Sequence, residues 1–119
     1  MAIVMTAVVN YFEIGSGDAD AARRFYGSLF GWTFGEPSAV GYRMINGTDG
    51  GLWDTGSMGA TSWAIFYVQV DDVAAAISQA ESLGATVAIP LVDNGRIEFG
   101  HLIDTQGNRF GVWRPKQAG

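Results

Sequence analysis

The chain has 119 residues, of which 48% are hydrophobic and 16% charged, so we expect a folded domain and not a disordered segment. The net charge of −5 and the seven basic residues argue against a nucleic-acid partner, because phosphate binding needs clustered lysine and arginine. Cysteine is absent, which excludes disulfides, thiolate catalysis and cysteine-based zinc sites. No apolar run reaches the ~20 residues of a membrane span, so we expect no membrane partner and a cytoplasmic location.

The first half of the chain predicts a strand, a helix and three short strands. Residues 7–14, AVVNYFEI, are β-branched and aromatic, as strands are. Ser16 or Asp18 is placed to cap a helix that ends at Gly31. Helical spacing puts five side chains on one face, where we expect them to fill the space between helix and sheet: Ala22, Phe25, Tyr26, Leu29 and Phe30. The three strands are expected at residues 32–36, 41–45 and 50–54.

The second half repeats this order. Residues 63–70 predict a strand, the pair Asp71-Asp72 caps a helix that ends at Gly84, and three strands follow at residues 85–89, 99–103 and 108–113. The two capped helices match in length within one residue. We therefore predict an α+β fold of two tandem βαβββ modules, residues 7–57 and 61–116, in a single domain spanning residues 1–119. Each sheet has a face that its helix does not cover, and function is expected there.

These residues resemble a known family. The pieces YFEI…DADAARRFYGSLFGW, VDDVAAAISQAESLGATVAIP and DTQGNRFGVW are similar to the vicinal oxygen chelate (VOC) superfamily, which includes glyoxalase I, bleomycin-resistance proteins, fosfomycin-resistance enzymes and extradiol dioxygenases. The resemblance spans about Asn10 to Pro115 and is nearest to the compact glyoxalase/bleomycin-resistance-like proteins. It implies the glyoxalase/bleomycin resistance/dihydroxybiphenyl dioxygenase-like fold.

The resemblance also implies where a metal ion would bind. Metal-dependent members take His or Glu ligands from the first strand and Glu ligands from the last strand of each module. Counting back from Asp18 places Tyr11 at the first-strand position of the first module, and counting back from Asp72 places Ile65 at that of the second. Counting forward through DTQGNRFG places Gly111 at the last-strand position. None of these three residues can bind a divalent ion as the family does. The fourth position, near residues 50–54, has no safe alignment. We therefore expect no metal and no other cofactor.

Two ionisable side chains are candidates for chemistry. Alternation along the first strand places Glu13 beside Tyr11, opposite Phe12 and Ile14, so a carboxylate enclosed by apolar walls is one interpretation, with an acid or base role. The other is a carboxylate at a pocket rim or dimer interface, paired with Arg43 or Arg109. His101, the single histidine, is either a strand residue packed on aromatic rings or a hydrogen-bonding group that lines a pocket.

The aromatic residues predict a binding surface. Trp and Tyr number four each, and several lie on or beside expected strands, where apolar walls suit a flat ligand. The alternative for any one of them is a place in the core or in a dimer interface. The predicted ligand-binding set is Tyr11, Glu13, Tyr42, Trp53, Trp63, Tyr67, His101 and Trp113.

The sequence thus predicts a metal-free VOC-type protein that binds a hydrophobic, aromatic small molecule, by bleomycin-resistance-like binding or sequestration. One alternative is a glyoxalase-like lyase or isomerase that uses Glu13, Tyr11 or His101 in proton transfer. Another is a regulatory or interaction module. Whether the chain is an enzyme stays open at this stage. Because a half-covered sheet exposes apolar surface, we also expect a homodimer.

Overall fold

The computed structural model describes residues 7–59 and 62–116. The chain forms two compact units. Among the described residues, the N-terminal unit comprises residues 11–59 and 62–65, and the C-terminal unit comprises residues 7–10 together with residues 66–116. The division falls within the first strand of each predicted module, and it does not test the predicted domain boundaries, which stay a prediction.

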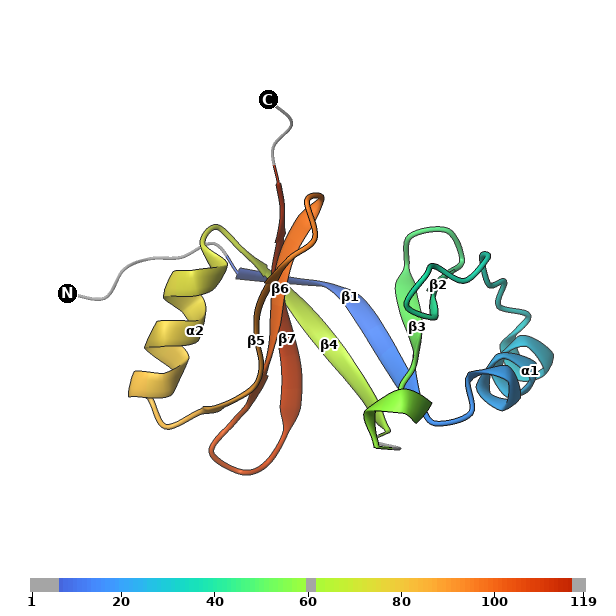
Figure 1. The fold of residues 1–119 in the computed structure, drawn as a ribbon, viewed down its shortest axis with the longest axis horizontal. Helices are drawn as coiled ribbons and strands as arrows, with labels where there is room; N and C mark the ends of the chain where they lie inside the picture. The colour runs from blue at the N-terminus through green and yellow to red at the C-terminus, as the bar shows by residue number, and fades with distance from the viewer. Residues whose placement is uncertain (1–6, 60–61, 117–119) are drawn as a thin grey trace. The chain divides into compact units, whose positions relative to one another are not determined.

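The N-terminal unit holds one helix and three strands. Along the chain these are β1 (Ala7–Ser16), α1 (Ala19–Phe30), β2 (Tyr42–Ile45) and β3 (Gly50–Asp54), followed by the 3₁₀ turn η1 (Gly56–Met58) (Figure 1). β1 pairs with β3 in parallel, and β2 pairs with β3 antiparallel, so the strand order is β2-β3-β1. The first strand of this module therefore lies beside its last strand.

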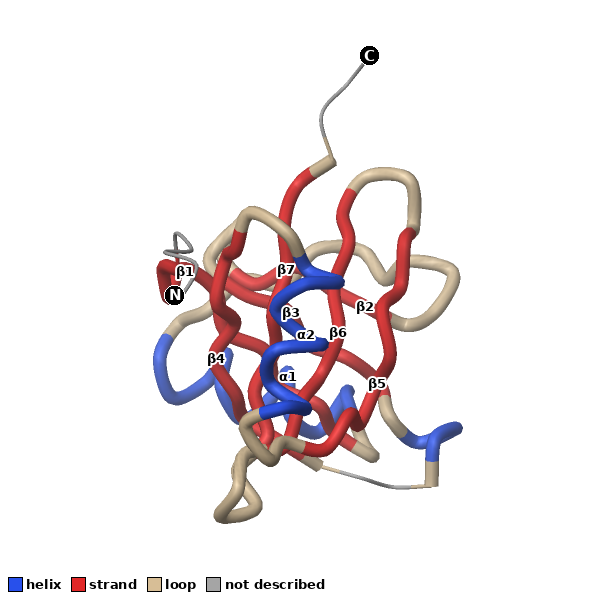
Figure 2. The backbone as a smooth tube through the Cα atoms, turned by 90° about the vertical axis from the view of Figure 1, so that its left-hand side faces the viewer, coloured by secondary structure: helices blue, strands red, loops and turns tan. Residues whose placement is uncertain are grey.

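The C-terminal unit repeats this arrangement with one more strand. Its elements are β4 (Trp63–Val70), α2 (Val73–Ser82), β5 (Thr86–Asp93), β6 (Ile97–Ile103) and β7 (Arg109–Pro115). β4 pairs with β7 in parallel, and β6 pairs antiparallel with both β7 and β5, which gives the order β4-β7-β6-β5. Figure 2 shows α2 lying across one face of these strands. Strands and two helices together confirm the predicted α+β class.

Of the cap residues that the sequence offered, Asp18 and Asp72 cap the two helices. The side chain of Asp18 accepts a hydrogen bond from the backbone N–H of Ala21 at 2.9 Å, and that of Asp72 accepts one from Ala75 at 3.0 Å. Each cap satisfies a backbone donor that has no partner inside the helix. Gly31 follows α1 with a φ of 72°, a left-handed conformation that ends a helix and that glycine adopts without strain.

The strand expected at residues 32–36 is wrong. Only an isolated bridge between Phe34 and Ile45 forms there. Backbone hydrogen bonds from Asn46 to Thr33 and from Gly35 to Met44 still hold the segment against β2. The reason is local, because Pro37 has no N–H to donate and Gly35 gains little from a strand conformation.

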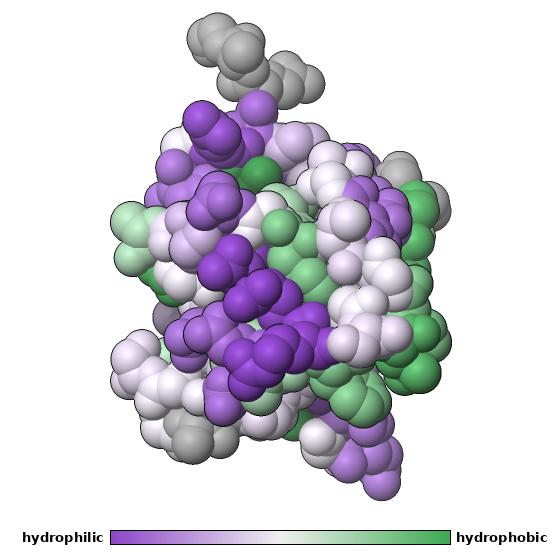
Figure 3. All heavy atoms as spheres, turned by 90° about the vertical axis from the view of Figure 1, so that its right-hand side faces the viewer, coloured by the Kyte–Doolittle hydropathy of each residue, from purple (hydrophilic) through white to green (hydrophobic). Residues whose placement is uncertain are grey.

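The predicted buried face of α1 is also partly wrong. Ala22 and Tyr26 do pack against the core cluster of Ile14, Ile45 and Leu52. Three other large side chains point away from it, since Phe25, Leu29 and Phe30 are 59%, 58% and 57% exposed. The space beside the helix is filled instead from outside it, by Phe12, Trp32 and Phe34. Figure 3 shows one face of the molecule, on which hydrophobic surface lies next to a hydrophilic band.

The C-terminal unit has a separate core between α2 and its sheet. Val70, Val73, Leu102 and Val112 are its buried members. Gly100 lets α2 approach closely, because a Cβ there would lie 3.0 Å from Cδ1 of Ile77. Neither helix of the described chain is long and apolar enough to cross a membrane.

Candidate functional site

Side-chain alternation along β1 separates a core face from a polar face, as predicted. Phe12 and Ile14 belong to the core beneath α1. Glu13 points to the other face, where the residue is 2% exposed. Buried carboxylates need hydrogen-bond partners. Burying a polar group without a partner costs about 2 to 7 kcal/mol, and burying an unpaired charge costs more. The partners of Glu13 therefore define this face.

Two aromatic side chains donate hydrogen bonds to Glu13. The hydroxyl of Tyr42 on β2 donates to Oε1 at 3.0 Å, and the indole Nε1–H of Trp63 on β4 donates to Oε2 at 2.9 Å. Both carboxylate oxygens are thus bound by neutral donors. Trp53 makes T-shaped contacts with both of these rings, with centroid distances of 6.0 Å to Tyr42 and 5.9 Å to Trp63. We call Glu13, Tyr42, Trp53 and Trp63, together with Tyr11, the Glu13 network.

Glycines make room for the rings of this network. Gly51 pairs with Glu13 across β1 and β3, and a Cβ at Gly51 would overlap the hydroxyl and ring of Tyr42. A Cβ at Gly15 would lie 2.5 Å from the indole of Trp63. Both rings therefore lie flat over a glycine, and this lets them reach the carboxylate.

A second phenol extends the network. The hydroxyls of Tyr11 and Tyr42 are 2.7 Å apart. Because Tyr42 donates its proton to Glu13, the hydroxyl of Tyr11 is the donor of this bond. Burial raises the pKa of Tyr11 to about 12, with a further rise from the Glu13 charge and an opposing effect of the Tyr42 hydrogen bond. Tyr11 is therefore a neutral phenol at physiological pH, and the three groups form a hydrogen-bonded line from Tyr11 through Tyr42 to Glu13.

The C-terminal unit contains a related but different arrangement around His101, which is fully buried. Tyr67 on β4 lies over Gly111, where a Cβ would be 2.5 Å from its ring, and its hydroxyl is 2.5 Å from Nε2 of His101. Nη1 of Arg109 is 3.0 Å from Nδ1 of His101. A guanidinium can only donate, so Nδ1 is the acceptor, and the imidazole is neutral with its proton on Nε2 facing Tyr67. We call His101, Tyr67 and Arg109 the His101 network.

Trp113 lies on β7, two residues beyond Gly111. Its indole Nε1–H donates to Oδ1 of Asn10 at 3.1 Å, and Nδ2 of Asn10 donates to Oε1 of Gln69 at 2.7 Å. These contacts fix the plane of the indole, which remains partly exposed. Trp113 is thus a fixed aromatic surface within the C-terminal unit.

The structure brings the predicted site residues together in two groups. The N-terminal unit holds Tyr11, Glu13, Tyr42, Trp53 and Trp63 in one network, and the C-terminal unit holds Tyr67 and His101 in contact, with Trp113 on the neighbouring strand. Sequence reasoning did not identify the participation of Gly15, Gly51, Asn10 and Gln69. Glycines inside aromatic-rich strands were the available signal, because such glycines often mark close approach by another group.

The strand registers locate the fourth position at which relatives bind metal. Glu13 and Tyr67 each lie five residues before a helix cap, and they pair with Gly51 and Gly111 respectively. Gly51 is therefore the equivalent of Gly111. With Tyr11 and Ile65, all four positions lack a side chain that binds a divalent ion in the family's way. No group of three or more His, Asp or Glu within residues 7–59 and 62–116 is arranged to hold a metal ion. The residues present do not fit the metal of this fold family.

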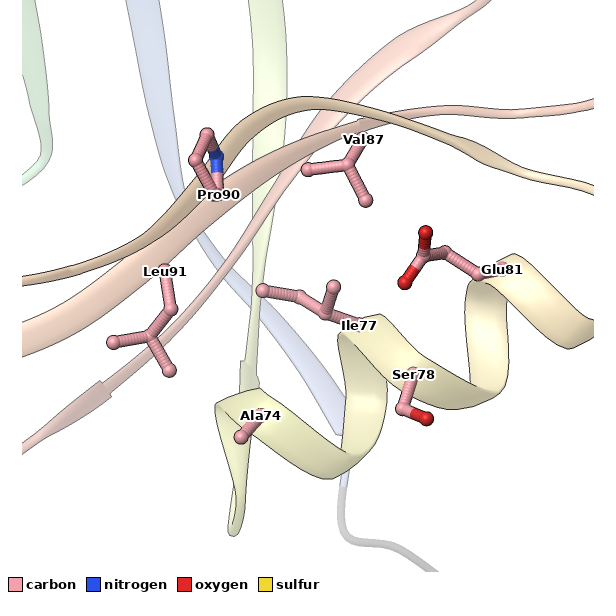
Figure 4. A pocket seen from close by; sticks show the side chains of 7 residues that line it. All are labelled: Ala74, Ile77, Ser78, Glu81, Val87, Pro90 and Leu91. Atoms are coloured by element: carbon pink, nitrogen blue, oxygen red, sulfur yellow. The ribbon is translucent and has the colours of Figure 1, made fainter.

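Each unit also has a shallow hollow. The one in the N-terminal unit has a volume of about 470 Å³ and lies beside Trp53, with Val40 and Met58 among its walls. The one in the C-terminal unit, about 410 Å³, lies between α2 and β5. Figure 4 shows Ile77 and Val87 facing each other across it. Of the predicted site residues, Trp53 lines the first hollow and none lines the second.

Comparison with known proteins gives the family. The glyoxalase-like domain family matches residues 11–113. The chain is 26% identical to "Putative glyoxylase CFP32" of Mycobacterium tuberculosis over 125 aligned positions, which cover 88% of this chain and 44% of that protein. The chain thus spans less than half the length of this curated relative.

Solved structures show the same fold. The hypothetical protein BH1468 of Bacillus halodurans is similar with a TM-score of 0.66 and 11% identity, over 96% of this chain and 98% of that one. The Mn(II)-bound glyoxalase of Novosphingobium aromaticivorans is similar with a TM-score of 0.60 and 18% identity, over 89% of this chain and 38% of that one. The family match over most of the chain and the shared fold lead to one conclusion: the chain belongs to the glyoxalase-like domain family of the vicinal oxygen chelate superfamily.

Proposed function

We propose that this protein binds a flat, hydrophobic, aromatic small molecule without a metal ion. The observation that carries the proposal is that two of the family's four metal-ligand positions are replaced by glycines, each lying under a tyrosine ring. Gly51 lies under the partly exposed Tyr42 and Gly111 under the buried Tyr67, so aromatic rings stand where relatives hold ligands. Apolar aromatic walls with a few fixed polar groups are typical of small-molecule sites.

The hydrogen bonds of the Glu13 network support binding because they hold its rings in place before a ligand arrives. Tyr42 and Trp63 are each bound to the buried Glu13, and Trp53 packs against both. A preorganised surface loses little side-chain entropy on binding. A ligand that buries ~150 Å² of apolar contact at ~25 cal/mol/Å² gains about 4 kcal/mol, to which polar contacts add.

Tryptophan fluorescence provides the test. Planar aromatic compounds are titrated into wild type, Trp53→Phe, Trp113→Phe and the control Trp32→Phe, whose indole packs between Phe12 and Tyr26 on the helix side of the sheet. We expect binding to weaken by roughly 5- to 50-fold, about 1–2 kcal/mol, in Trp53→Phe or Trp113→Phe and to stay unchanged in Trp32→Phe. Equal affinity in all four proteins would refute the proposed binding surface and favour an interaction module.

A metal-free lyase or isomerase is the second candidate, and the line of hydrogen bonds from Tyr11 through Tyr42 to Glu13 favours it. A proton can pass along such a line, and the CFP32 relative is named as a glyoxylase. His101 is a weaker choice for this role, because both of its ring nitrogens are bound by Tyr67 and Arg109. Turnover of a carbonyl substrate that persists with EDTA and is lost in Glu13→Gln would support catalysis. Binding without turnover supports the first proposal.

A homodimer also stays a proposal. The exposed side chains of Phe25, Leu29 and Phe30 on α1 supply apolar surface of the kind that a second copy covers. Light scattering tests it: a mass of twice 12.7 kDa that falls to 12.7 kDa in Phe25→Ser/Leu29→Ser would support it. A wild-type monomer at micromolar concentration would contradict it.

A further inference from the structure

The hollow beside Trp53 has the features of a site for a small molecule. Its volume of about 470 Å³ lies within the range of ~300–1,000 Å³ that ligand pockets occupy. Its apolar walls include Val40 and Met58, which are 71% and 44% exposed, and the half-buried Trp53. Large apolar side chains that remain exposed around one hollow gain free energy when a ligand covers them.

The walls of this hollow are held in place by hydrogen bonds. The turn that carries Val40 is closed by Ser38, whose hydroxyl accepts from the backbone N–H groups of Val40 at 3.3 Å and Tyr42 at 3.2 Å. On the opposite wall the backbone N–H of Met58 donates to the carbonyl of Thr55 at 2.9 Å. Trp53 is braced by edge-on contacts with Tyr42 and Trp63. These contacts hold the backbone on either side of the hollow in place.

The charge of the hollow is supplied by one carboxylate. Asp54 follows Trp53 at the end of β3, and none of the seven lining residues is basic. The backbone N–H of Gly56 donates to Oδ1 of Asp54 at 3.0 Å, which fixes the carboxylate at the rim. A cation beside this group is attracted both by the negative charge and by the electron-rich face of an indole.

We infer that this hollow binds an organic cation with a planar apolar body, which stacks on Trp53 while its positive charge lies beside Asp54. The inference rests on the proposed function, because it identifies the class of aromatic ligand. It adds that the ligand is cationic and that its site lies within the N-terminal unit. An anionic aromatic compound of the same size meets an unfavourable charge and binds more weakly.

The test uses three probes that share one ring system and differ in charge. Trimethyl(2-naphthyl)ammonium is the cation, 2-tert-butylnaphthalene is its neutral isostere, and 2-naphthalenesulfonate is the anion. Binding is followed by the indole N–H signals of ¹⁵N-labelled protein, in which Trp53→Phe assigns the Trp53 signal. We expect the cation to shift this signal and to bind at least 10-fold more tightly than the anion.

Asp54→Asn provides the matched variant, because the amide oxygen can still accept from Gly56 while the charge is removed. Asp49→Asn is the control, since it makes the same charge change on an exposed aspartate outside the hollow. We expect the cation to bind about 5- to 10-fold more weakly to Asp54→Asn and with unchanged affinity to Asp49→Asn. The neutral probe should bind Asp54→Asn and Asp49→Asn with the same affinity.

The outcomes separate this inference from the proposed function. If the neutral probe binds as tightly as the cation, or if Asp54→Asn leaves the affinity for the cation unchanged, the inference is wrong and aromatic binding survives. A shift of another tryptophan without Trp53 likewise overturns the inference alone. If none of the three probes alters any tryptophan signal, both the inference and the proposed function fail.

Discussion

The Glu13 network and the His101 network occupy equivalent strands of the two repeats. Both place a tyrosine ring over a glycine, but the buried polar group beside the ring differs between them. In both, the last strand of the module carries a glycine that lets a tyrosine ring lie across it, Gly51 under Tyr42 and Gly111 under Tyr67. The polar centre differs, because the N-terminal unit buries a carboxylate whereas the C-terminal unit buries an imidazole bound to a guanidinium. The origin of the tyrosine differs as well, since Tyr42 comes from β2, the second strand of its module along the chain, and Tyr67 comes from β4, the first strand of its module.

This comparison shows which feature of the repeat depends on the backbone and which depends on side chains. Gly51 pairs with Glu13 and lies under Tyr42, and Gly111 pairs with Tyr67 and lies under it. Each tyrosine ring can lie there only because the glycine has no side chain. The polar partner is exchangeable, provided that its hydrogen bonds are satisfied. Substitutions at matched positions of the two units can therefore break the comparison or sharpen it.

The largest effect is expected when a methyl group is added to these glycines. Gly51→Ala places a Cβ inside the ring of Tyr42, so either the ring leaves Glu13 or the strands separate. We expect Gly51→Ala to lower the free energy of unfolding by ~3 kcal/mol, which is the upper end of the usual cost of overpacking. Gly111→Ala should lower it by ~2 kcal/mol, because the overlap with Tyr67 is smaller. Urea denaturation measures both.

A second substitution controls for the cause. If steric overlap with the ring is responsible, Gly51→Ala should cost less than 1 kcal/mol when it is added to Tyr42→Ala, because the ring is then absent. An equal cost with and without Tyr42 would show that the glycine is needed for another reason.

The next effect concerns the buried carboxylate. Glu13→Gln replaces one acceptor oxygen by an NH₂ group, which faces the hydroxyl of Tyr42 or the N–H of Trp63, both donors. We expect a loss of ~2 kcal/mol, since a buried donor is left unsatisfied. Thermal or urea unfolding of Glu13→Gln and Tyr42→Phe/Glu13→Gln checks it, and the double variant should lose less than the sum of its parts. Strict additivity would contradict a hydrogen bond between these two groups.

A smaller and equal effect is expected where the repeats agree. Asp18→Ala and Asp72→Ala each remove one helix cap of the same geometry. Each should lower the free energy of unfolding by ~1 kcal/mol. Asp18→Asn and Asp72→Asn, which retain the acceptor, should lower it by less. A large difference between the two alanine variants would show that the repeat is only apparent at its helix starts.

The smallest effect lies in the alkaline range. The phenol of Tyr11 has a pKa of about 12 in the folded protein and 10.0 when exposed, so the unfolded chain loses this proton first as the pH rises. The contribution to stability is complete below pH 10 and is lost between pH 10 and about 12. Absorbance at the tyrosinate band should show a late-titrating component that Tyr11→Phe removes. Titration of all tyrosines near pH 10 would contradict the burial of this group.

The sequence alone predicted the features that depend on neighbouring residues. The two aspartate caps, the repeat and the separation of Phe12 and Ile14 from Glu13 all follow from local spacing, and the structure confirms them. The face of α1 was predicted wrongly for a physical reason. Helical spacing places Phe25 and Leu29 near Tyr26, but it does not determine how far the helix is rotated against the sheet.

The networks themselves could not be predicted, because they depend on strand register. Trp63 reaches Glu13 from 50 residues away, and Gly51 becomes the partner of Glu13 only through the parallel pairing of β1 with β3. The same register supplies the fourth metal-ligand position, which the sequence left without an alignment. The glycines were visible in the sequence, but the sequence did not show that a tyrosine ring lies over each of them.

The central claim is that aromatic rings have taken the place of a metal centre in this protein. The most direct measurement titrates a planar aromatic probe, trimethyl(2-naphthyl)ammonium, into protein treated with EDTA and into the same protein supplied with Mn²⁺, Ni²⁺ or Zn²⁺. Elemental analysis of the untreated protein accompanies it. The account predicts the same affinity in every sample and much less than one metal ion per chain. One bound metal ion per chain, together with probe binding that EDTA abolishes and the metal restores, would contradict it.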